Sequence, residues 1–337
     1  MNPQTTPHQK EDDQVLDITL RPQSLAEYQG QNKVKENLKI IIDAAQRRRE
    51  PIEHVLLCGS AGLGKTTLSH VIAKEMGVGI RVTSGPAIER SGDLVSILTN
   101  LQEGEILFID ECHRLNKTIE EVLYPAMEDY KIDIIIGKGP SARTLELSLP
   151  RFTLIAATTK TGLLSAPLRS RFGITFRLDF YKNEEMERII ARSAAILNIK
   201  IDEAAVGFLA KCSRRTPRVA NRLLKRARDF AQVRNNNLLD RETAQQALEM
   251  LEVDEFGLEP IDRLILTTVI EKFDGGPVGL QSIAASIEED ERTIEDVYEP
   301  YLMQTGFLIR TSRGRLASDL AYEHLGFPLK KKVTKLF

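Results

Sequence analysis

Short apolar runs alternate with helical patterns through the first half of the chain. Five runs have the length and composition of buried strands: residues 55–58, 79–82, 105–111, 152–159 and 174–178. Between the runs, apolar residues recur at intervals of three and four, as at Leu68, Val71 and Ile72. Strands that alternate with helices predict an α/β domain with a parallel sheet, which we place at residues 18–181.

The second half of the chain is expected to be mostly helical. Apolar residues recur at helical intervals over residues 182–252, which predicts a small helical domain at 182–254, and a linker follows at 253–260. The pattern then predicts three helices and a hairpin: residues 261–273, 280–287, 291–298 and 307–316. That order is typical of a winged helix, here residues 255–337. The polar leader, residues 1–17, is expected to be disordered.

Two alternating apolar runs interrupt the α/β pattern at residues 131–149. They flank a Gly/Pro turn at residues 137–140, which predicts a hairpin inserted into the α/β domain. Such a hairpin either covers a sheet edge or projects its Ile and Leu side chains as a binding site for a partner. The pattern alone leaves both interpretations open.

Composition describes an ordinary globular chain. Of 337 residues, 42% are hydrophobic and 28% charged, and the net charge of -2 means that any nucleic-acid surface must be local. The three cysteines have no paired spacing, so they are expected to be reduced and buried rather than in disulfides or a zinc site. Neither a signal core nor a run of membrane-spanning length occurs, which predicts a cytoplasmic protein without membrane contact.

A glycine-rich segment joins the first predicted strand to the helix after it. Residues 59–66 match the pattern Gly-x-x-x-x-Gly-Lys-Ser/Thr, in which backbone N–H groups and a helix amino terminus surround a phosphate. Gly62 and Gly64 allow the backbone to turn. Lys65 is expected to bridge the β and γ phosphates and the Thr66 hydroxyl to hold Mg²⁺. The segment predicts nucleotide binding.

Two predicted strands end in groups suited to hydrolysis. Asp110 and Glu111 end one apolar run, at the strand end where doubly wound sheets carry their chemistry. Asp110 is expected to bind Mg²⁺ through water, and Glu111 to orient or deprotonate the attacking water. Thr159 ends another run, where a hydroxyl suits sensing of the γ-phosphate or its attacking water. Together these groups predict hydrolysis rather than binding alone.

Arginines and lysines gather at two places. Arg169 and Arg171 precede the last strand of the α/β domain, where they either stabilise a phosphoryl group or are solvated, and spacing does not decide between these. Residues 211–234 hold nine Lys or Arg against one acid, which suits a DNA-facing helix or a basic lid over triphosphate. We favour the lid for Arg218, because Pro217 opens a helix whose amino end would face the nucleotide.

The charges of the predicted winged helix indicate how it would meet DNA. Residues 288–299, around the third helix, carry seven carboxylates and one arginine, so lying deep in a groove would bring repulsion from phosphates. By contrast, residues 300–318 contain no acid and carry Arg310, Arg313 and Arg315. This contrast predicts contact through the wing to the DNA backbone, without base reading.

Seven short motifs together carry a resemblance to a known family. They are Leu-Arg-Pro at 20–22, Gly-Leu-Gly-Lys-Thr-Thr at 62–67, Ile-Asp-Glu at 109–111, Leu-Tyr-Pro-Ala-Met-Glu-Asp at 123–129, Thr-Pro-Arg at 216–218, Gly-Gly-Pro-Val-Gly-Leu at 275–280 and Glu-Pro-Tyr-Leu at 299–302. From about Leu20 to Gly326, the chain resembles the RuvB family of AAA+ ATPases, ring motors of Holliday-junction branch migration. The resemblance implies a P-loop AAA+ domain, a helical lid and a winged-helix domain that use ATP and Mg²⁺.

The resemblance also implies roles for individual residues. The adenine would be surrounded by Leu20, Arg21, Tyr181 and Pro217. The phosphates and Mg²⁺ would be held by Gly62, Gly64, Lys65, Thr66, Thr67 and Asp110. Thr159 and Arg218 would be the two sensors, while Glu128, Asp129 and Tyr130 would lie close to the nucleotide site. Arg171 resembles an arginine finger that reaches the ATP of a neighbouring subunit, so hydrolysis would need assembly.

The partners implied by the resemblance are DNA and proteins. A homo-hexamer would pump duplex DNA at Holliday junctions in recombination and repair, its lid and winged domain swinging together on hydrolysis. The hairpin, at Leu145 and Leu147, would dock on RuvA, the junction-binding partner, and RuvC would join in the resolving complex. The DNA phosphates would be touched by Arg310, Arg313 and Arg315, with Arg292 a weaker candidate.

The chain departs from the family pattern at several positions, and two alternative functions remain to be weighed. Ser170 replaces an Asp and Arg215 a Gly, which bear on subunit contact and lid geometry. One alternative is a clamp-loader-like ATPase that opens a protein ring, which the winged domain and acid-free wing disfavour. The other is a nucleotide-switched, sequence-specific DNA-binding regulator, which the acidic third helix disfavours.

Overall fold

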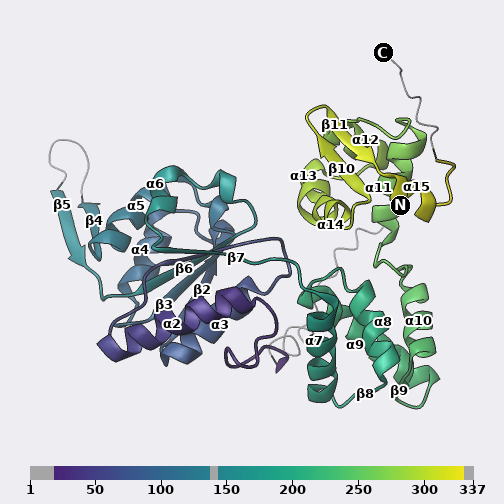
Figure 1. Cartoon of the computed structure of the whole chain (residues 1–337). Coiled ribbons are helices and arrows are strands. Elements are labelled where there is room, and N and C mark those ends of the chain that lie inside the picture. Colours follow the sequence, from purple (N-terminus) through teal and green to yellow (C-terminus); the bar gives the residue numbers. More distant parts are fainter. Residues whose placement is uncertain (1–18, 137–142, 330–337) are drawn as a thin grey trace. The chain divides into compact units, whose positions relative to one another are not determined.

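The computed structural model describes residues 19–136 and 143–329 (Figure 1). The chain forms two compact units, residues 1–185 and 186–337. The predicted leader and the predicted turn at 137–140 lie outside the described residues. In the described part of the chain, every helix is too short or too polar to cross a membrane.

A five-stranded parallel sheet organises the first unit, as predicted. Its order is β2-β3-β6-β1-β7, so β1, which leads into the glycine-rich segment, lies between two strands that come much later in the chain. The strands are β1 (Val55–Cys58), β2 (Ile80–Ser84), β3 (Ile106–Asp110), β6 (Thr153–Thr158) and β7 (Ile174–Arg177). Because all pairs are parallel, the carboxyl ends of β1, β3 and β6 meet at one edge.

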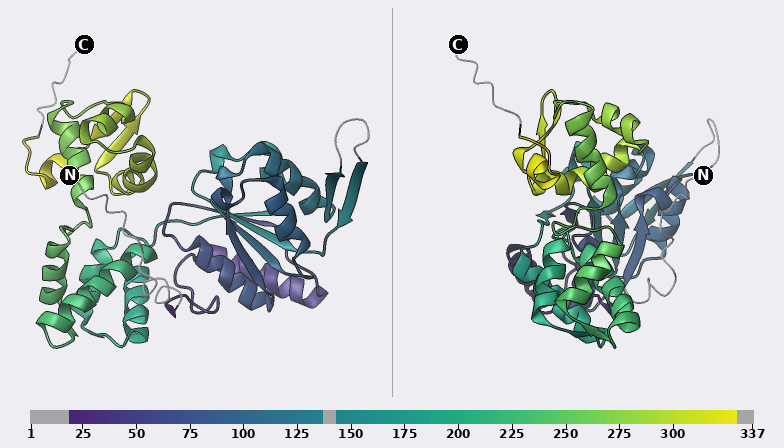
Figure 2. Two further views of the ribbon diagram at one scale, coloured as in Figure 1. Left: turned by 180° about the vertical axis from the view of Figure 1, so that it is seen from behind. Right: turned by 90° about the vertical axis from the view of Figure 1, so that its right-hand side faces the viewer.

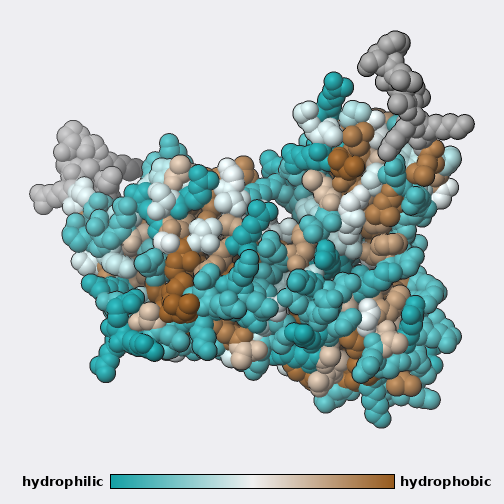
Figure 3. Space-filling model, in the orientation of Figure 1, coloured by the Kyte–Doolittle hydropathy of each residue, from teal (hydrophilic) through white to brown (hydrophobic). Residues whose placement is uncertain are grey.

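Helices cover both faces of this sheet, because alternate strand residues point to opposite sides. Leu56, Leu107 and Leu154 belong to one core cluster with the inner faces of α4 (Ser91–Thr99) and α5 (Lys117–Glu128). Figures 1 and 2 show α2 (Asn32–Arg48) and α3 (Lys65–Met76) on the other face. Figure 3 shows apolar residues gathered over α2, which exposes Ile40.

The predicted hairpin is present as a separate antiparallel pair. β4 (Lys131–Ile136) and β5 (Arg143–Ser148) pair so that Ile132 faces Leu147 and Ile134 faces Leu145. Burial falls along this face: Ile132 is fully buried, Leu147 packs partly on the main core, and Leu145 is 45% exposed. The base of the hairpin is therefore anchored to the α/β domain, while its outer part projects an apolar side chain.

The second unit begins with the predicted helical domain. Its helices are α7 (Asn183–Ile196), α8 (Glu203–Cys212), α9 (Pro217–Arg234) and α10 (Arg241–Met250), with the two-residue strands β8 (Lys200–Ile201) and β9 (Leu238–Leu239) between them. Asp202 and Asp240 each accept a backbone N–H three residues on and so begin α8 and α10. Two short polar caps thus set the starts of neighbouring helices.

The winged helix follows in the order that the sequence predicts. Its elements are α11 (Pro260–Glu271), α12 (Leu280–Ile287), α13 (Glu291–Thr293), α14 (Glu299–Gln304), β10 (Leu308–Thr311), β11 (Gly314–Ala317) and α15 (Asp319–His324). The third helix was predicted to end at Tyr298, and this is wrong. A π-helical turn, Ile294–Tyr298, leads directly into α14. Pro300 does not stop the helix because it stands in the first turn of α14, where no intrahelical N–H bond is needed.

All three cysteines are free and buried, as predicted. Cys58 ends β1 and Cys112 follows the Asp-Glu pair, while Cys212 ends α8. Burial raises the pKa of the Cys212 thiol to about 12, with the nearby Asp254 carboxylate acting in the same direction, and burial also raises the pKa of Cys112. These two thiols therefore stay protonated at neutral pH.

His54, just before β1, makes the stability of the chain depend on pH. Its Nδ1 accepts from the Leu154 N–H (2.8 Å) and its Nε2 lies 3.0 Å from the Met127 carbonyl, so the neutral ring is satisfied, and burial lowers its pKa below the usual 6.5. Below pH 6.5 the unfolded chain binds a proton that the folded chain does not, so stability falls as pH drops. We expect the urea midpoint of the wild-type chain to fall more than that of His54→Gln between pH 7.5 and 5.5. Equal decreases of the urea midpoint in the two proteins would contradict this role of His54.

Candidate nucleotide-binding site

The P-loop, residues 59–66, connects β1 to α3 at the carboxyl edge of the sheet. Gly64 has φ 93°, and a Cβ there would lie 2.8 Å from the Tyr28 hydroxyl, so only glycine fits. The Lys65 ammonium is buried and donates to the carbonyls of Gly59 (2.8 Å) and Ser60 (2.9 Å). The loop thus holds a positive charge at the start of α3, where N–H groups and the helix dipole favour an anion.

Two tyrosines, Tyr28 and Tyr181, pack the segments before and after the parallel sheet against this loop. The Tyr181 hydroxyl lies 3.1 Å from both the Tyr28 hydroxyl and the Leu63 carbonyl. The Gln31 side chain bonds both backbone groups of Asp179. Burial raises the pKa of Tyr28 well above 10 and that of Tyr181 to about 12, so both phenols stay protonated. The segment upstream of the P-loop therefore packs against the loop, with Leu20 buried nearby in the chain.

Asp110 and Thr66 come together at the edge where β1 and β3 end. The Thr66 hydroxyl donates to Asp110 Oδ2 at 3.1 Å, and the other oxygen, Oδ1, accepts from the Glu111 N–H at 3.0 Å. A hydroxyl facing a carboxylate is a donor set of the oxygen type that Mg²⁺ prefers. The side chains predicted to hold the metal thus fit it chemically and lie in contact.

Glu111 lies between two side chains that orient its carboxylate. The Thr159 hydroxyl is 3.5 Å from Glu111 Oε2, and His113 Nε2 is 3.4 Å from the same oxygen. His113 is fixed in turn, because its Nδ1 lies 3.0 Å from the Thr158 hydroxyl. The ends of β3 and β6 therefore place a carboxylate, a sensor hydroxyl and an imidazole together.

Arg171 is held in place at the other end of the sheet. It closes α6 (Ala166–Ser170) and precedes the start of β7, which pairs in parallel with the start of β1. Its guanidinium donates to the Pro167 carbonyl (2.8 Å) and to Glu128 (3.0 Å), and lies 4.3 Å above the Tyr124 ring centre. Because the P-loop follows the carboxyl end of β1, Arg171 does not lie beside the P-loop of its own chain.

The residues after α5 share this position. Glu128 pairs with Arg171, Asp129 closes α5, and the Tyr130 ring packs 5.9 Å from Phe152, just before β6 begins. The resemblance expects Glu128, Asp129 and Tyr130 near a nucleotide. The structure does not bring them to the P-loop of the same chain.

In the second unit, α9 begins at Pro217 as predicted, which places Arg218 in its first turn. Arg214 and Arg215, just upstream, both have φ 54°, a left-handed conformation that suits the glycine of the family pattern at position 215. Most of the nine basic residues between 211 and 234 are not a free surface. Five of them form ion pairs: Lys211–Glu255, Arg214–Asp262, Arg222–Glu259, Arg226–Asp229 and Arg228–Asp229. Three of these five pairs use acids that lie outside residues 211–234, so the charge count of the stretch alone overstated its free positive charge.

The wing presents its arginines unequally. Arg310 and Arg313 are exposed, as is Arg292 on α13. Arg315, directly opposite Arg310 in the hairpin register, instead donates from Nε and Nη2 to the two oxygens of Glu299, at 3.0 and 2.9 Å. Glu299 is buried, so the charge of Arg315 is largely matched within the domain.

Family models cover nearly all of the described chain. The P-loop domain of the Holliday junction DNA helicase RuvB matches residues 20–178, the RuvB AAA lid domain residues 181–254, and the RuvB C-terminal winged-helix domain residues 255–326. The chain belongs to the RuvB family. This membership removes the clamp-loader and regulator alternatives as the main interpretation.

Solved structures of RuvB from Thermotoga maritima have the same architecture. One, described as the Holliday junction branch migration motor, is 47% identical over 93% of this chain and all of that chain, with a TM-score of 0.86. A lysine-to-arginine variant is 48% identical over 92% of this chain and 99% of that one, with a TM-score of 0.86. An arginine-to-alanine variant is 47% identical over the same shares, with a TM-score of 0.85.

The sequence did not predict two participants in this RuvB-family site, His113 and Tyr28, or the burial of Arg214 in the lid. His113 stands two residues after Glu111, close enough that the motif could have suggested it. Tyr28 has no local signal that marks it, because its bond to Tyr181 spans 153 residues. Arg214 was counted as one of nine similar basic residues, although it is buried and paired.

Proposed function

We propose that the chain is an ATP-driven motor that moves duplex DNA at Holliday junctions in recombination and repair, as a hexameric ring. The observation that carries this function is the joining of one hydrolytic site, Thr66 with Asp110 and Glu111, to a RuvB-type lid and winged helix in a single chain. We take the ATPase domain as 18–181, the lid as 182–254 and the winged helix as 255–337.

The P-loop side chains support binding of ATP with Mg²⁺. Lys65 would exchange its two loop carbonyls for phosphate oxygens, while Gly62, Gly64 and Thr67 offer backbone N–H groups. Thr66 and Asp110 would hold Mg²⁺, which neutralises phosphate charge when bound. The adenine would meet Leu20, Arg21, Tyr181 and Pro217, with Arg218 as second sensor.

Hydrolysis would use Glu111 to orient water and accept its proton, and Thr159 to position water or the γ-phosphate. His113 holds the Glu111 carboxylate from the other side, which limits the directions that it samples. Arg171 would complete the site of the next subunit together with Glu128, Asp129 and Tyr130, because these residues lie away from their own P-loop. A ring is therefore needed for full activity.

The outer part of the hairpin would dock on RuvA, with RuvC joining the resolving complex. Leu145 is 45% exposed beyond an anchored base, and Leu147 lies nearer the core. We expect Leu145→Asp to weaken RuvA binding by at least roughly tenfold, because a charge would replace an apolar contact at the interface. Calorimetric titration with RuvA measures this. Ile40→Asp, on exposed α2, is the matched control, and equal losses in both variants would contradict the assignment.

The wing would contact DNA phosphates through Arg310 and Arg313, with Arg292 and the partly neutralised Arg315 as further candidates. We expect Arg310→Ala/Arg313→Ala to weaken binding of unrelated duplexes equally and to reduce the slope of log K against log salt by about 2. Fluorescence anisotropy across a salt series measures the slope. Arg234→Ala, an exposed lid arginine, should leave it unchanged.

The motor function is tested on a synthetic four-way junction with RuvA. We expect the chain to convert the junction into two duplexes only when ATP is hydrolysed, with little dependence on arm sequence. Equal conversion with a non-hydrolysable ATP analogue would overturn the function, as would hydrolysis stimulated by DNA without any movement of the junction.

A further inference from the structure

The motif Glu-Pro-Tyr-Leu at 299–302 has no part in the nucleotide site or in the exposed wing. It begins α14, and its two polar members are both buried: Glu299 is 1% exposed and Tyr301 5%. Buried polar groups need partners, since an unpaired one costs free energy. The partners of Glu299 and Tyr301 lie in opposite directions, one on the wing and one on the lid.

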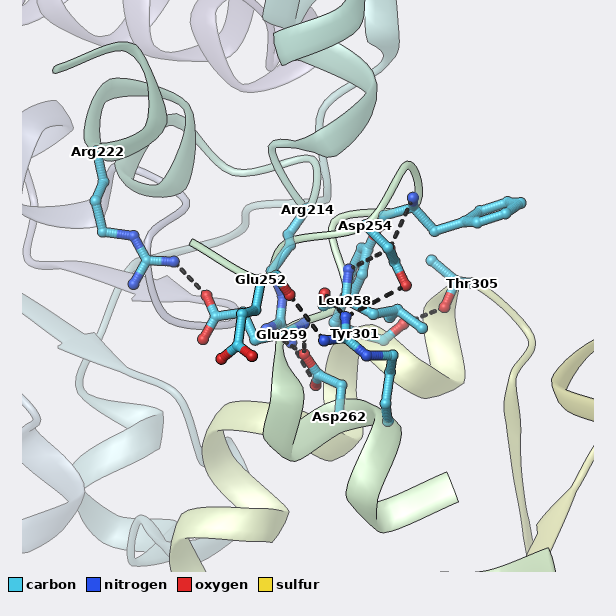
Figure 4. Close-up of polar contacts among 11 residues, drawn as sticks. Arg214, Arg222, Glu252, Asp254, Leu258, Glu259, Asp262, Tyr301 and Thr305 are labelled. Atoms are coloured by element: carbon cyan, nitrogen blue, oxygen red, sulfur yellow. Dashed lines mark hydrogen bonds and ion pairs between the residues drawn. The ribbon is translucent and has the colours of Figure 1, made fainter. Parts of the chain in front are cut away.

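Tyr301 meets the lid through Arg214. The Arg214 guanidinium lies 4.6 Å above the Tyr301 ring centre, and the Tyr301 hydroxyl donates to the Phe256 carbonyl at 2.5 Å. Arg214 comes from the loop between α8 and α9, four residues before Arg218, so this contact joins that loop of the lid to the winged helix (Figure 4). A planar guanidinium over an aromatic ring is favourable and fixes their relative orientation.

Arg214 is also paired with α11. Its two terminal nitrogens donate to the two oxygens of Asp262, at 3.0 and 3.2 Å, and Asp262 accepts the Glu259 N–H at 2.8 Å (Figure 4). Burial raises the pKa of Asp262 to about 6, against the opposing effect of Arg214, so the carboxylate is ionised at neutral pH. Asp262 is fully buried and Arg214 is 7% exposed. Removing either partner would leave a buried charge uncompensated.

The connection between lid and winged helix is a packed joint, although the sequence predicted only a linker at 253–260. Gly257 has φ 73°, and a Cβ there would lie 2.3 Å from the Cys212 carbonyl at the end of α8. Asp254 accepts the N–H groups of Phe256 and Leu258, both at 2.9 Å, and pairs with His324 of α15 at 2.8 Å. The chain therefore passes between the domains through a segment that is packed and hydrogen-bonded to both.

At its other end, the motif reaches the wing. Glu299 holds Arg315 by two hydrogen bonds, and the Arg315 backbone exchanges hydrogen bonds with Val278 at 2.7 and 2.9 Å. Arg315 lies opposite Arg310 on β10. Glu299 and Tyr301 stand two residues apart on α14, so one short helix carries both the contact to the lid and the contact to the wing.

The residues that make this path are Arg214, Asp262, Tyr301, Glu299 and Arg315, which we name the coupling network. We propose that the coupling network fixes the wing to the lid loop that leads into Pro217 and Arg218 at the start of α9, so that lid movement during ATP hydrolysis is delivered to DNA. Its members are positioning residues, since none touches nucleotide in this role. The proposal rests on the motor function proposed above.

Weakening the network should separate hydrolysis from movement. The P-loop, Asp110 and Glu111 belong to the first unit, whereas every residue of the coupling network belongs to the second. We therefore expect Asp262→Leu to keep most ATP hydrolysis while reducing junction movement per ATP hydrolysed by roughly two- to thirtyfold. A residue that only maintained the fold would lower both activities together.

The test compares charge-breaking variants with a charge-free pair in the full-length chain. Junction movement and ATP hydrolysis are measured together with RuvA for Asp262→Leu, Arg214→Met and the double variant, in which two apolar side chains replace the ion pair. The double variant is expected to recover only part of the movement per ATP, because it removes the uncompensated buried charge but still lacks the contact of Arg214 with Tyr301. Arg214→Lys keeps the positive charge but loses the paired hydrogen bonds to Asp262 and the stacking on Tyr301. Its movement per ATP should therefore lie between those of the wild type and Asp262→Leu.

Arg222→Gln is the matched control, because Arg222 pairs with Glu259 at the same joint but on its surface, where ion pairs contribute little. Thermal unfolding shows whether each variant is folded. If Asp262→Leu does not fold, the comparison of movement per ATP between Arg214→Lys and Arg222→Gln tests the proposal. Unchanged movement per ATP in both Asp262→Leu and Arg214→Lys would overturn the coupling role alone. Failure of the wild-type chain to move the junction would overturn the motor function and this role with it.

Discussion

Glu111→Gln is expected to reduce ATP hydrolysis by about 10²–10⁴-fold and to leave ATP binding in place. The amide occupies the same space and can still accept from Thr159, but it cannot take a proton from water. Thr66 and Asp110 remain able to hold Mg²⁺, because their side chains contact each other and not the side chain of Glu111. Steady-state hydrolysis together with binding of a fluorescent ATP analogue separates the two effects.

The matched control is Glu105→Gln. Glu105 stands just before the start of the same strand, β3, and its carboxylate pairs with Arg81 at 3.1 Å, away from the carboxyl edge. We expect Glu105→Gln to hydrolyse ATP at close to the wild-type rate. A loss in Glu111→Gln that is no larger than in this control would show that Glu111 does not activate water.

Arg171→Ala is expected to reduce hydrolysis by about 10³–10⁵-fold, and mixing it with Glu111→Gln subunits should restore part of the activity. Arg171 is held by Glu128 and Tyr124 near the amino-terminal end of β7, away from its own P-loop. In a mixed ring, a Glu111→Gln subunit offers its intact Arg171 to a neighbour whose Glu111 is intact. Hydrolysis measured across mixing ratios should therefore pass through a maximum.

The neighbouring Arg169→Ala variant controls for loss of charge on α6. Arg169 is exposed and lies in the last turn of the same helix, so we expect near wild-type hydrolysis. The result could instead be additive: at every mixing ratio of Arg171→Ala with Glu111→Gln, the hydrolysis rate would equal the sum of the rates of the two separate variants. That outcome would show that Arg171 does not act in the nucleotide site of a neighbouring subunit.

Local signals predicted much of the fold and the P-loop side of the site. The strand, glycine loop and helix around Lys65 lie within one short segment, so each residue type could be matched to its required conformation. Asp110 and Glu111 follow the same logic, since a buried parallel strand places its last residues at the functional edge. The start of α9 at Pro217 was predictable because proline favours the first helical turn.

Long-range pairing accounts for what the sequence did not predict. The position of β1 between β6 and β7 depends on partners at Ile155 and Ile174, which no local pattern around Val55 encodes. The Arg214–Asp262 pair spans 48 residues, and a buried arginine has the same local sequence signature as a solvated one. The continuation of helix from Tyr298 through Pro300 was not predicted, because the π-helical turn that leads into α14 has no pattern in the local sequence.

The burial of the native thiols simplifies experiments that attach reporters. The sequence contains three cysteines, and all are enclosed, with Cys112 and Cys212 held protonated. A maleimide dye reacts with accessible thiolate, so the folded wild-type chain should resist labelling. A cysteine introduced at Val233, which is 81% exposed on α9, would then be labelled selectively. Fluorescence could follow the lid during turnover in a chain that keeps its natural core.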